Sequence, residues 1–422
     1  MRELGRVPAG WRLVRLGKVL EICRNGLVCP QDAEPSKGIP VSRIETISDG
    51  TIDWRRIGHA SPEHADPSYL VLQGDILLSH INSVRHIGKV ARKQDERPLI
   101  HGMNLMLLRF SSHVDASFGF ALLEWYRTKQ YFERRAKKAV NQASINQADI
   151  RDFEFALPPL YEQRAIAAVL DAVGDAIERA EAVISATERL RDALLHELLT
   201  RGVPGWHTQW REVPGLGTIP ADWQVVRLGD AGCWLSGGTP SKARADFWSG
   251  ALPWVSPKDM KARELCHTQN RISLEGARAG SRIVPEGTIF VVVRGMILAH
   301  SFPLAVSRVA AAFNQDIRAL ICRDGLLPDF VLAALEQQKP RLLHLPSPST
   351  HGTMRVVSEE LFATKLPVPS PREQGVIAAV LGQVDDAIAR TRENRIGLEP
   401  FKASAAESLL TGRIRLPHLL RA

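Results

Sequence analysis

EQRAIAAVLDAVGDAI, residues 162–177, returns as EQGVIAAVLGQVDDAI at residues 373–388, with eleven of the sixteen positions identical. The two copies are 211 residues apart, which is half of the 422-residue chain. Self-similarity at a fixed period is the sequence signature of a repeated architecture. The chain is therefore predicted to be a tandem duplication, and the remaining features are interpreted against that repeat.

Each copy predicts a long helix, because its apolar residues follow the alternating spacing of four and three that is typical of a coiled-coil seam. A helix of about 40 residues would be roughly 60 Å long, and two similar seams in one chain are expected to pair into a rod. The apolar positions are Ile166, Leu170, Val173, Ile177, Ala180, Ile184, Thr187, Leu190, Leu194 and Leu198 in the first copy, and Ile377, Leu381, Val384, Ile388, Thr391, Leu398, Ala405 and Leu409 in the second.

The second helix contains Gly397 and Pro400. A proline inside a helix removes a hydrogen bond and costs ~3 kcal/mol or more. This segment is therefore expected to kink or break the helix.

The two halves also begin alike. PAGWRLVRLG at residues 8–17 matches PADWQVVRLG at residues 220–229 in seven of ten positions. Short apolar runs between turn residues predict strands, and a helix is expected at 118–138 in the first half and at 328–338 in the second. The predicted fold class is α+β. The predicted divisions are a globular domain at 1–156, a helix at 157–202, a linker and second domain at 203–365, a helix at 366–413 and a tail at 414–422.

The charge of the chain is concentrated outside the predicted helices. Residues 160–202 hold eight acidic and five basic residues, residues 371–413 hold six of each, and the whole chain carries +8. The other segments therefore carry +11, and a basic surplus on globular domains fits a polyanionic partner such as DNA. No apolar run reaches the ~18 residues of a membrane span, and five scattered cysteines predict reduced thiols in the cytoplasm.

Motifs for catalysis are weak. Asp66-Pro67-Ser68-Tyr69 is similar to the tetrapeptide of DNA amino-methyltransferases, but no glycine-rich strand-to-helix turn for S-adenosylmethionine accompanies it. The chain has no phosphate-binding loop, and its thirteen histidines show no metal-ligand spacing. A non-catalytic binding protein without cofactor or metal is expected. The alternatives are a self-contained DNA adenine methyltransferase and a coiled-coil adaptor that contacts only proteins.

Side chains in loops of both domains could read base edges or phosphates. In the second domain, the segment 236–242 also offers backbone amides for phosphate. The candidate DNA-binding residues are Lys37, Arg43, Asn82, Ser83, Arg85, His86, Lys89, Asn141, Gln142, Ser144, Asn146, Ser236, Gly237, Gly238, Thr239, Ser241, Lys242, Lys258, Arg294, Asn314, Gln315, Ser349, Thr350, His351, Thr353 and Arg355.

Two variable domains, each opened by P-x-x-W-x-x-x-R-L-G and each followed by a helix beginning EQ, resemble the specificity subunit of type I restriction-modification enzymes. The stretch Ser236-Gly237-Gly238-Thr239-Pro240-Ser241 also resembles the start of a recognition domain in that family. The first domain lacks this stretch and has Arg24-Asn25-Gly26 near that place.

The resemblance implies that each domain is a target recognition domain for one half of a split DNA sequence. It implies that the helices pair antiparallel, act as a ruler and dock methyltransferase subunits, with two such subunits and a separate motor-nuclease subunit as partners. Methylation and cleavage would then belong to the partners. By residue, the spacing and docking role falls on Glu162, Gln163, Ile166, Leu170, Glu373, Gln374, Ile377 and Leu381.

Overall fold

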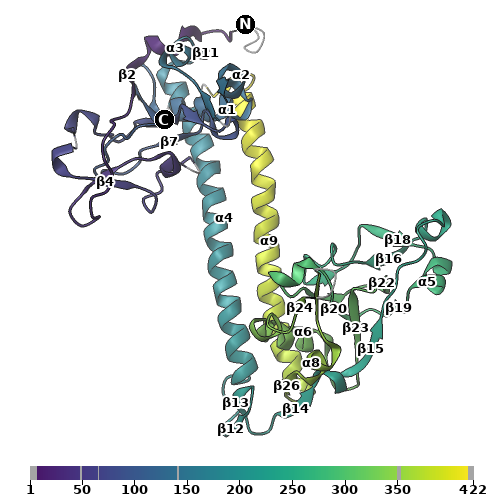
Figure 1. Cartoon of the computed structure of the whole chain (residues 1–422). Helices are drawn as coiled ribbons and strands as arrows, with labels where there is room; N and C mark the ends of the chain where they lie inside the picture. The colour runs from purple at the N-terminus through teal and green to yellow at the C-terminus, as the bar shows by residue number, and fades with distance from the viewer. Residues whose placement is uncertain (1–6, 48–49, 65, 140–141, 349–352, 417–422) are drawn as a thin grey trace. The chain divides into compact units, whose positions relative to one another are not determined.

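The computed structural model describes residues 7–47, 50–64, 66–139, 142–348 and 353–416. The chain divides into two compact units, residues 1–182 with 392–422 and residues 183–391. Both long helices contribute a segment to each unit (Figure 1). In the described residues no helix is long and apolar enough to span a membrane.

The first unit is built on an antiparallel sheet whose apolar residues form the core. The central strands have consecutive buried apolar residues, such as Ile76, Leu77 and Leu78, because their side chains pack on both faces of the sheet. The sheet order is β2 (Leu20–Asn25), β8 (Leu105–Phe110), β5 (Ile76–Ser79) and β7 (Val90–Arg92). Smaller pairings join β1 (Arg12–Arg15) to β11 (Glu154–Leu157), β3 (Ile39–Val41) to β4 (Gly58–Ala60), and β6 (Ile81–Asn82) to β10 (Gln142–Ser144) and β9 (Lys137–Ala139).

Helices α1 (Ala116–Thr128), α2 (Tyr131–Arg135) and α3 (Gln147–Arg151) belong to the same unit. The carboxylate of Asp115 caps the start of α1 by accepting from Ser117 N and Phe118 N, which explains why the helix begins there. The helix expected at 118–138 is therefore divided, because Gln130 takes a left-handed conformation and β9 begins at Lys137.

The second unit repeats this plan with a longer sheet. Its order is β15 (Gly232–Ser236), β23 (Ile317–Cys322), β20 (Ile289–Val292), β21 (Leu304–Ser307) and β17 (Glu264–Leu265). A second sheet holds β18 (Asn270–Ile272), β16 (Leu252–Val255), β22 (Ala311–Phe313) and β19 (Ile283–Val284), and β14 (Gln224–Arg227) pairs with β26 (Lys365–Val368). The helices are α5 (Leu274–Gly280), α6 (Pro328–Gln337), α7 (Lys339–Leu342) and α8 (Ser358–Ala363).

The two long helices are α4 (Leu160–Thr200) and α9 (Pro371–Leu410). In the first unit Ile166 and Leu170 of α4 share a core with Leu409 and Leu410 of α9. In the second unit Leu195 and Leu198 of α4 share a core with Ile377 and Leu381 of α9. Within each unit the start of one helix therefore packs with the end of the other, so the segments run antiparallel.

Three sequence expectations about these regions are wrong in detail. Of the kink or break expected at Pro400, the break does not occur, because α9 continues through Pro400. Leu190 is 53% exposed, because the four-three spacing from Thr187 leads to Arg191 and not to Leu190. The segment 203–218 is not a plain linker, because β12 (Trp210–Val213) and β13 (Gly217–Pro220) form a hairpin within and beyond it.

Candidate DNA-recognition surfaces and the domain–helix junctions

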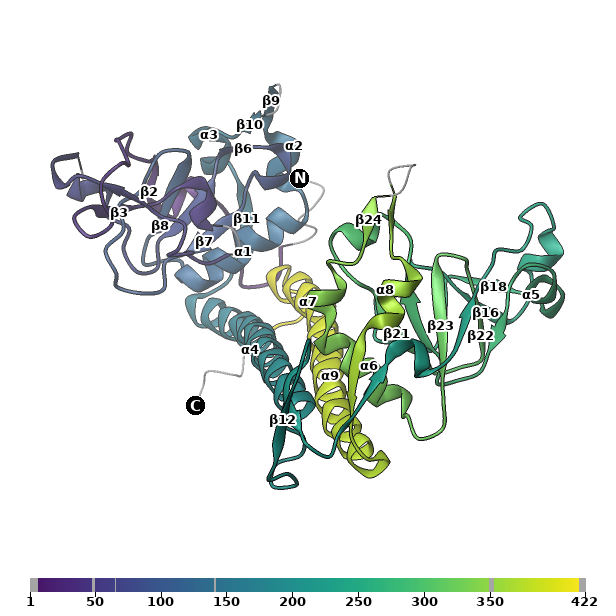
Figure 2. The same ribbon diagram turned by 60° about the horizontal axis from the view of Figure 1, so that its bottom comes forward.

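In the first unit, several predicted DNA-binding residues come together on a small three-stranded sheet. Asn82 of β6 lies opposite Ala143 of β10, and Gln142 and Ser144 belong to the same strand (Figure 2). The turn after β6 carries Arg85, which is exposed. We call β6, the turn 83–89, β9 and β10 the first polar surface.

The charge of the first polar surface is positive. Burial together with the nearby Lys89 and Arg85 cations lowers the pKa of His86 below its ordinary value. Lys137 and Lys138, which were not among the predicted residues, are exposed on β9 beside β10. Their signal was the basic run ERRAKK after α1, which the prediction of one continuous helix concealed.

The second unit has a hairpin at the corresponding place in the repeat. Strands β24 (Ser347–Pro348; labelled in Figure 2) and β25 (Met354–Arg355) pair with each other. The backbone of Arg294 forms an isolated bridge with that of Arg355. In the first unit Ser144 pairs with Ile81, which are the repeat equivalents of Arg355 and Arg294. We call Arg294, Thr353, β24 and β25 the second polar surface.

The predicted DNA-binding residues, including those of the two polar surfaces, differ in how far they are exposed. Among the predicted DNA-binding residues, those with exposed side chains are Lys37, Ser83, Arg85, Gln142, Asn146, Ser236, Ser241, Lys242, Lys258, Arg294, Gln315 and Arg355. Those of intermediate exposure are Arg43, Asn82, His86, Lys89, Ser144, Gly237, Gly238, Thr239 and Thr353. Asn141, Ser349, Thr350 and His351 lie outside the described residues.

Three of the predicted residues have side chains with partners inside the chain. Asn314 is only 6% exposed, and its side chain bonds the backbone and carboxylate of Asp316, so it holds a turn. Arg43 is half-buried and donates to the side chain and carbonyl of Gln31. Asn146 is exposed, but its side chain is committed to the capping box of α3 with Asp149.

The segment 236–242 is held by close packing of its backbone. A Cβ on Gly237 would lie 2.3 Å from the Phe313 carbonyl oxygen, and one on Gly238 would lie 2.3 Å from the Gly280 carbonyl oxygen. The backbone N–H of Gly238 donates to Phe313, so it is not available to a phosphate. The two glycines are therefore explained by packing, which corrects the expected phosphate role of the Gly238 amide.

Each globular domain is fixed to the start of the long helix that follows it. In the first unit the carboxylate of Glu162 accepts from the indole Nε1 of Trp11 at 3.0 Å and from Arg415 at 2.6 and 2.8 Å. Gln163 accepts from Asp115 N and donates to the carbonyl groups of His113 and Pro158. All of these bonds join α4 to its own domain or to the segment that follows α9.

The second unit repeats the junction. The carboxylate of Glu373 accepts from Trp223 Nε1 at 3.1 Å and from Val203 N at 3.0 Å, and it lies 2.8 Å from His207 Nε2. Gln374 accepts from Leu327 N and donates to the carbonyl groups of Gly325 and Pro369. The glutamate and glutamine of the repeated EQ motif therefore serve to hold a domain on its helix.

The residues predicted to dock methyltransferase subunits are buried within the chain. Glu162, Gln163, Ile166, Leu170, Glu373, Gln374, Ile377 and Leu381 are all at most 5% exposed. A side chain that is bonded and packed inside its own chain cannot form the contact surface for another subunit.

An ion-pair cluster in the second unit was not predicted from the sequence. Arg191 of α4 bonds Glu336 of α6 at 2.7 Å and also bonds Asp385 of α9. Arg263 lies 3.3 Å from each of the same two carboxylates. Burial alone would lower the pKa of Arg191, but the two carboxylates outweigh this effect and raise it. The sequence signal for this cluster was Arg191, a charged residue at a position where the four-three spacing places an apolar one.

The tetrapeptide that suggested a methyltransferase is a capped turn. The carboxylate of Asp66 accepts from Ser68 N at 2.8 Å, and Tyr69 lies under the guanidinium of Arg24, 4.2 Å from the ring centre. These contacts account for the residues without a substrate. Across the described residues no group of three His, Cys, Asp or Glu side chains is placed to hold a metal ion.

Comparison with known proteins agrees with the repeat. The family model described as type I restriction modification DNA specificity domain matches the chain twice, at residues 8–185 and 220–398. A protein of Methanocaldococcus jannaschii, provisionally named type I restriction enzyme MjaX specificity subunit, is 30% identical over 98% of this chain and 96% of its own length. The EcoR124I/EcoR124II specificity subunit of Escherichia coli is 32% identical over 39% of this chain and 41% of its own length.

Solved structures show the same fold. The S subunit of a type I restriction-modification system from M. genitalium aligns over 97% of this chain and 98% of its own, with a TM-score of 0.63 and 14% identity. A chain from a study of complex assembly in a type I system aligns over 97% and 100%, with a TM-score of 0.56 and 19% identity. Because the family model covers more than half of the residues and the MjaX relative nearly all of them, the chain belongs to the family of type I restriction-modification DNA specificity subunits.

Proposed function

We propose that the two recognition domains each read one half of a bipartite DNA sequence, the first through the first polar surface and the second through the second polar surface. The observation that carries this proposal is that each domain has a hairpin at the corresponding place in the repeat, paired with the segment around Ile81 in the first domain and bridged to Arg294 in the second, while the side chains differ. Side chains on such a hairpin can reach base edges, which carry the sequence information.

The helices α4 and α9 set the distance between the two half-sites and dock methyltransferase subunits, with two such subunits expected. A motor-nuclease subunit joins the same complex, and the chain itself performs no catalysis. Its place of action is the cytoplasm. The family membership and the buried EQ junctions support this division, because the junctions tie each reading domain to a fixed point on a helix.

Charge reversal on one surface at a time tests the proposal. Arg85→Glu in the first polar surface and Arg294→Glu in the second should each relax selection at one half-site and leave the other half-site unchanged. The measurement is selection of bound sequences from a randomised duplex library by the purified complex, with Arg390→Glu on the exposed face of α9 as the control. Unchanged selection by both variants, with complex assembly intact, would favour the protein-adaptor alternative.

A further inference from the structure

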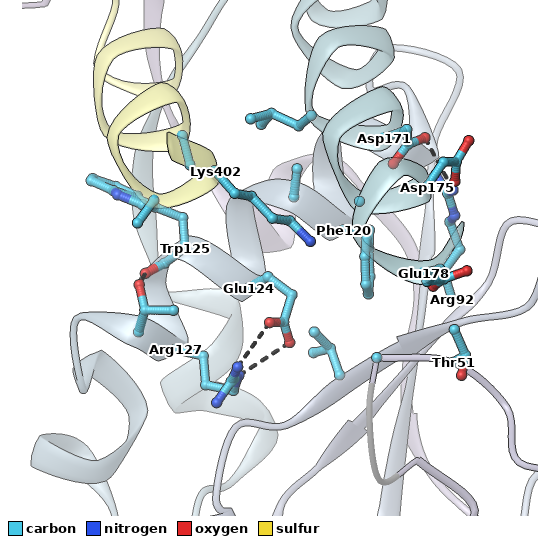
Figure 3. Close-up of a pocket in the computed structure, with 18 of the residues that line it drawn as sticks. Thr51, Arg92, Phe120, Glu124, Trp125, Arg127, Asp171, Asp175, Glu178 and Lys402 are labelled. Atoms are coloured by element: carbon cyan, nitrogen blue, oxygen red, sulfur yellow. Dashed lines mark hydrogen bonds and ion pairs between the residues drawn. The ribbon is translucent and has the colours of Figure 1, made fainter. Parts of the chain in front are cut away.

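A cavity of about 740 Å³ in the first unit is lined by side chains of both charges. Lys402, the repeat equivalent of Arg191, extends from α9 toward its interior (Figure 3). Glu124 is paired with Arg127 at 2.9 and 3.1 Å, and further acidic and cationic side chains line the walls. Because both signs of charge are present, the lining selects neither a cation nor an anion. A more selective feature lies in the second unit, beside the second polar surface.

Two large apolar side chains are exposed next to each other at this place. Met296 and Ile297 are 60% and 43% exposed, and they open the short helical turn η8 (Met296–Ala299). Single exposed apolar residues are ordinary on a protein surface, whereas grouped ones mark a contact site. The next residue, Leu298, is buried in the core and anchors the turn, while the two side chains before it remain in solvent.

The backbone holds this turn against the β24–β25 hairpin. The N–H of Gly295 donates to the carbonyl of Met354 at 3.0 Å, and the neighbouring Arg294 forms its backbone bridge with Arg355. Gly295 has a φ of +139°, a conformation that suits glycine because it has no Cβ. The apolar pair therefore has a fixed place relative to the hairpin.

The charged groups beside the apolar pair are mainly cationic. Arg294 comes directly before the turn at Gly295, and the side chains of Arg294 and Arg355 are both exposed. The carboxylate of Asp316, whose backbone carbonyl accepts from Arg294 N, already accepts from the side chain of Asn314. Flanking cations favour a polyanion over an apolar protein surface as the partner of this turn.

The corresponding turn of the first unit has different chemistry. The exposed side chains of residues 83–86 are those of Ser83 and Arg85. Such polar groups suit hydrogen bonds to base edges. An apolar pair suits instead the apolar group that the major groove displays, which is the C5-methyl group of thymine.

We propose that Met296 and Ile297 contact the C5-methyl group of a thymine in the half-site read by the second domain. This inference rests on the proposed function and names the base feature that the second polar surface selects. It also makes the two domains chemically different, because the equivalent turn of the first domain is polar. Covering one methyl group with apolar side chains should strengthen binding about fourfold.

Replacing thymine by deoxyuridine tests the contact, because it removes the methyl group and nothing else. The recognised sequence is first selected from a randomised duplex library by the purified complex that contains the full chain. The library is unmodified, so thymine is the only base in it that carries a C5-methyl group. The second half-site is the one whose selection Arg294→Glu relaxes. Each thymine of the selected site is then replaced singly, and the dissociation constant is measured.

The variants separate the apolar contact from the fold of the turn. Met296→Ser combined with Ile297→Ser removes the apolar pair, whereas Met296→Leu keeps an apolar surface. Leu274→Ser is the matched control, because Leu274, at the start of α5, is 57% exposed in the same unit. Thermal unfolding checks that each variant is folded.

We expect deoxyuridine at one or more positions of the second half-site to weaken binding about fourfold in wild type, Met296→Leu and Leu274→Ser. The double-serine variant should bind the thymine and deoxyuridine duplexes equally. Deoxyuridine in the first half-site should affect wild type and the double-serine variant alike.

Three results would overturn the inference and leave the proposed function intact. They are a second half-site without thymine, wild-type binding that deoxyuridine does not change, and a methyl dependence that the double-serine variant retains. A complex that selects no sequence, or whose selection Arg294→Glu does not change, would instead overturn the proposed function and the inference with it.

Discussion

Trp223 donates its indole N–H to the carboxylate of Glu373 at 3.1 Å, across 150 positions of sequence. The first half makes the same bond between Trp11 and Glu162, but the remaining partners of the carboxylate differ. Glu162 receives Arg415, from the end of the chain after α9, whereas Glu373 receives His207 and the backbone of Val203, from the segment after α4. Each junction therefore joins a domain, the helix that follows it and the segment that leaves the other helix.

Removing the indole donor should destabilise the junction. Trp223→Phe leaves a carboxylate that is 2% exposed without one of its donors, and an unsatisfied buried charge costs about 1 to 3 kcal/mol or more. The free energy of unfolding from urea titration should fall by about that amount. Trp210→Phe is the control, because Trp210 is 46% exposed, and an equal loss in both variants would contradict the role of the bond.

Acid should weaken the first junction. Burial alone would raise the pKa of Glu162, but hydrogen bonds from Arg415 and Trp11 outweigh it and hold the pKa below its ordinary value. The folded state then binds fewer protons than the unfolded state, so the stabilisation is present above the ordinary pKa of about 4.3 and is lost as pH falls through the lower folded value.

Thermal unfolding between pH 6 and pH 3.5 measures this effect. Wild type should lose more stability over the range than Arg415→Met, in which the main charged partner is absent. Parallel curves for the two proteins would show that the pair does not contribute to the pH dependence.

Truncating Arg191 in the ion-pair cluster should lower the free energy of unfolding much more than truncating Lys402, its repeat equivalent. Arg191→Met leaves Glu336 and Asp385 with only Arg263, and breaking a shielded pair costs about 3 kcal/mol. Lys402→Met, at the repeat-equivalent position, should change the free energy of unfolding by less than about 0.5 kcal/mol. Denaturant titration of both variants measures the free energy of unfolding. A similar decrease in the two variants would contradict the proposed difference between the units.

Lengthening both helices should change the spacing of the half-sites. Four residues inserted after Ala180 in α4 and four after its equivalent Thr391 in α9 add roughly one turn, about 6 Å, to each helix. The Arg395–Glu181 bond shows that these parts of α4 and α9 lie together, so paired insertions suit the antiparallel arrangement. Sequencing of selected duplexes should give the same half-site bases with a different gap, and an unchanged gap would contradict the ruler.

The sequence predicted the architecture well where the spacing of apolar residues along the chain determines the secondary structure. The duplicated stretches at 162–177 and 373–388 indicated both long helices, because a four-three spacing of apolar residues is a local property of the chain. The break expected at Pro400 does not occur. A proline can be accommodated when the helix on either side of it is continuous, as it is in α9.

The site was predicted less well, because its contacts join residues far apart in sequence. The pairing of Arg191 with Glu336 spans 145 positions, and only the folded chain brings them together. Gly237 and Gly238 looked like a phosphate cradle, but their lack of side chains allows close approach of Phe313 and Gly280. The EQ pairs were assigned to docking through the family resemblance, which carries no information on how deeply each side chain is buried.

The central claim is that this chain determines which DNA sequence a modification complex recognises. The most direct measurement is methylome sequencing of a host that expresses the chain with its methyltransferase subunit, compared with a host that expresses the methyltransferase subunit alone. We expect a bipartite methylated motif with a fixed gap that appears only when the chain is present. Methylation that is absent, or that is the same without the chain, would contradict the claim.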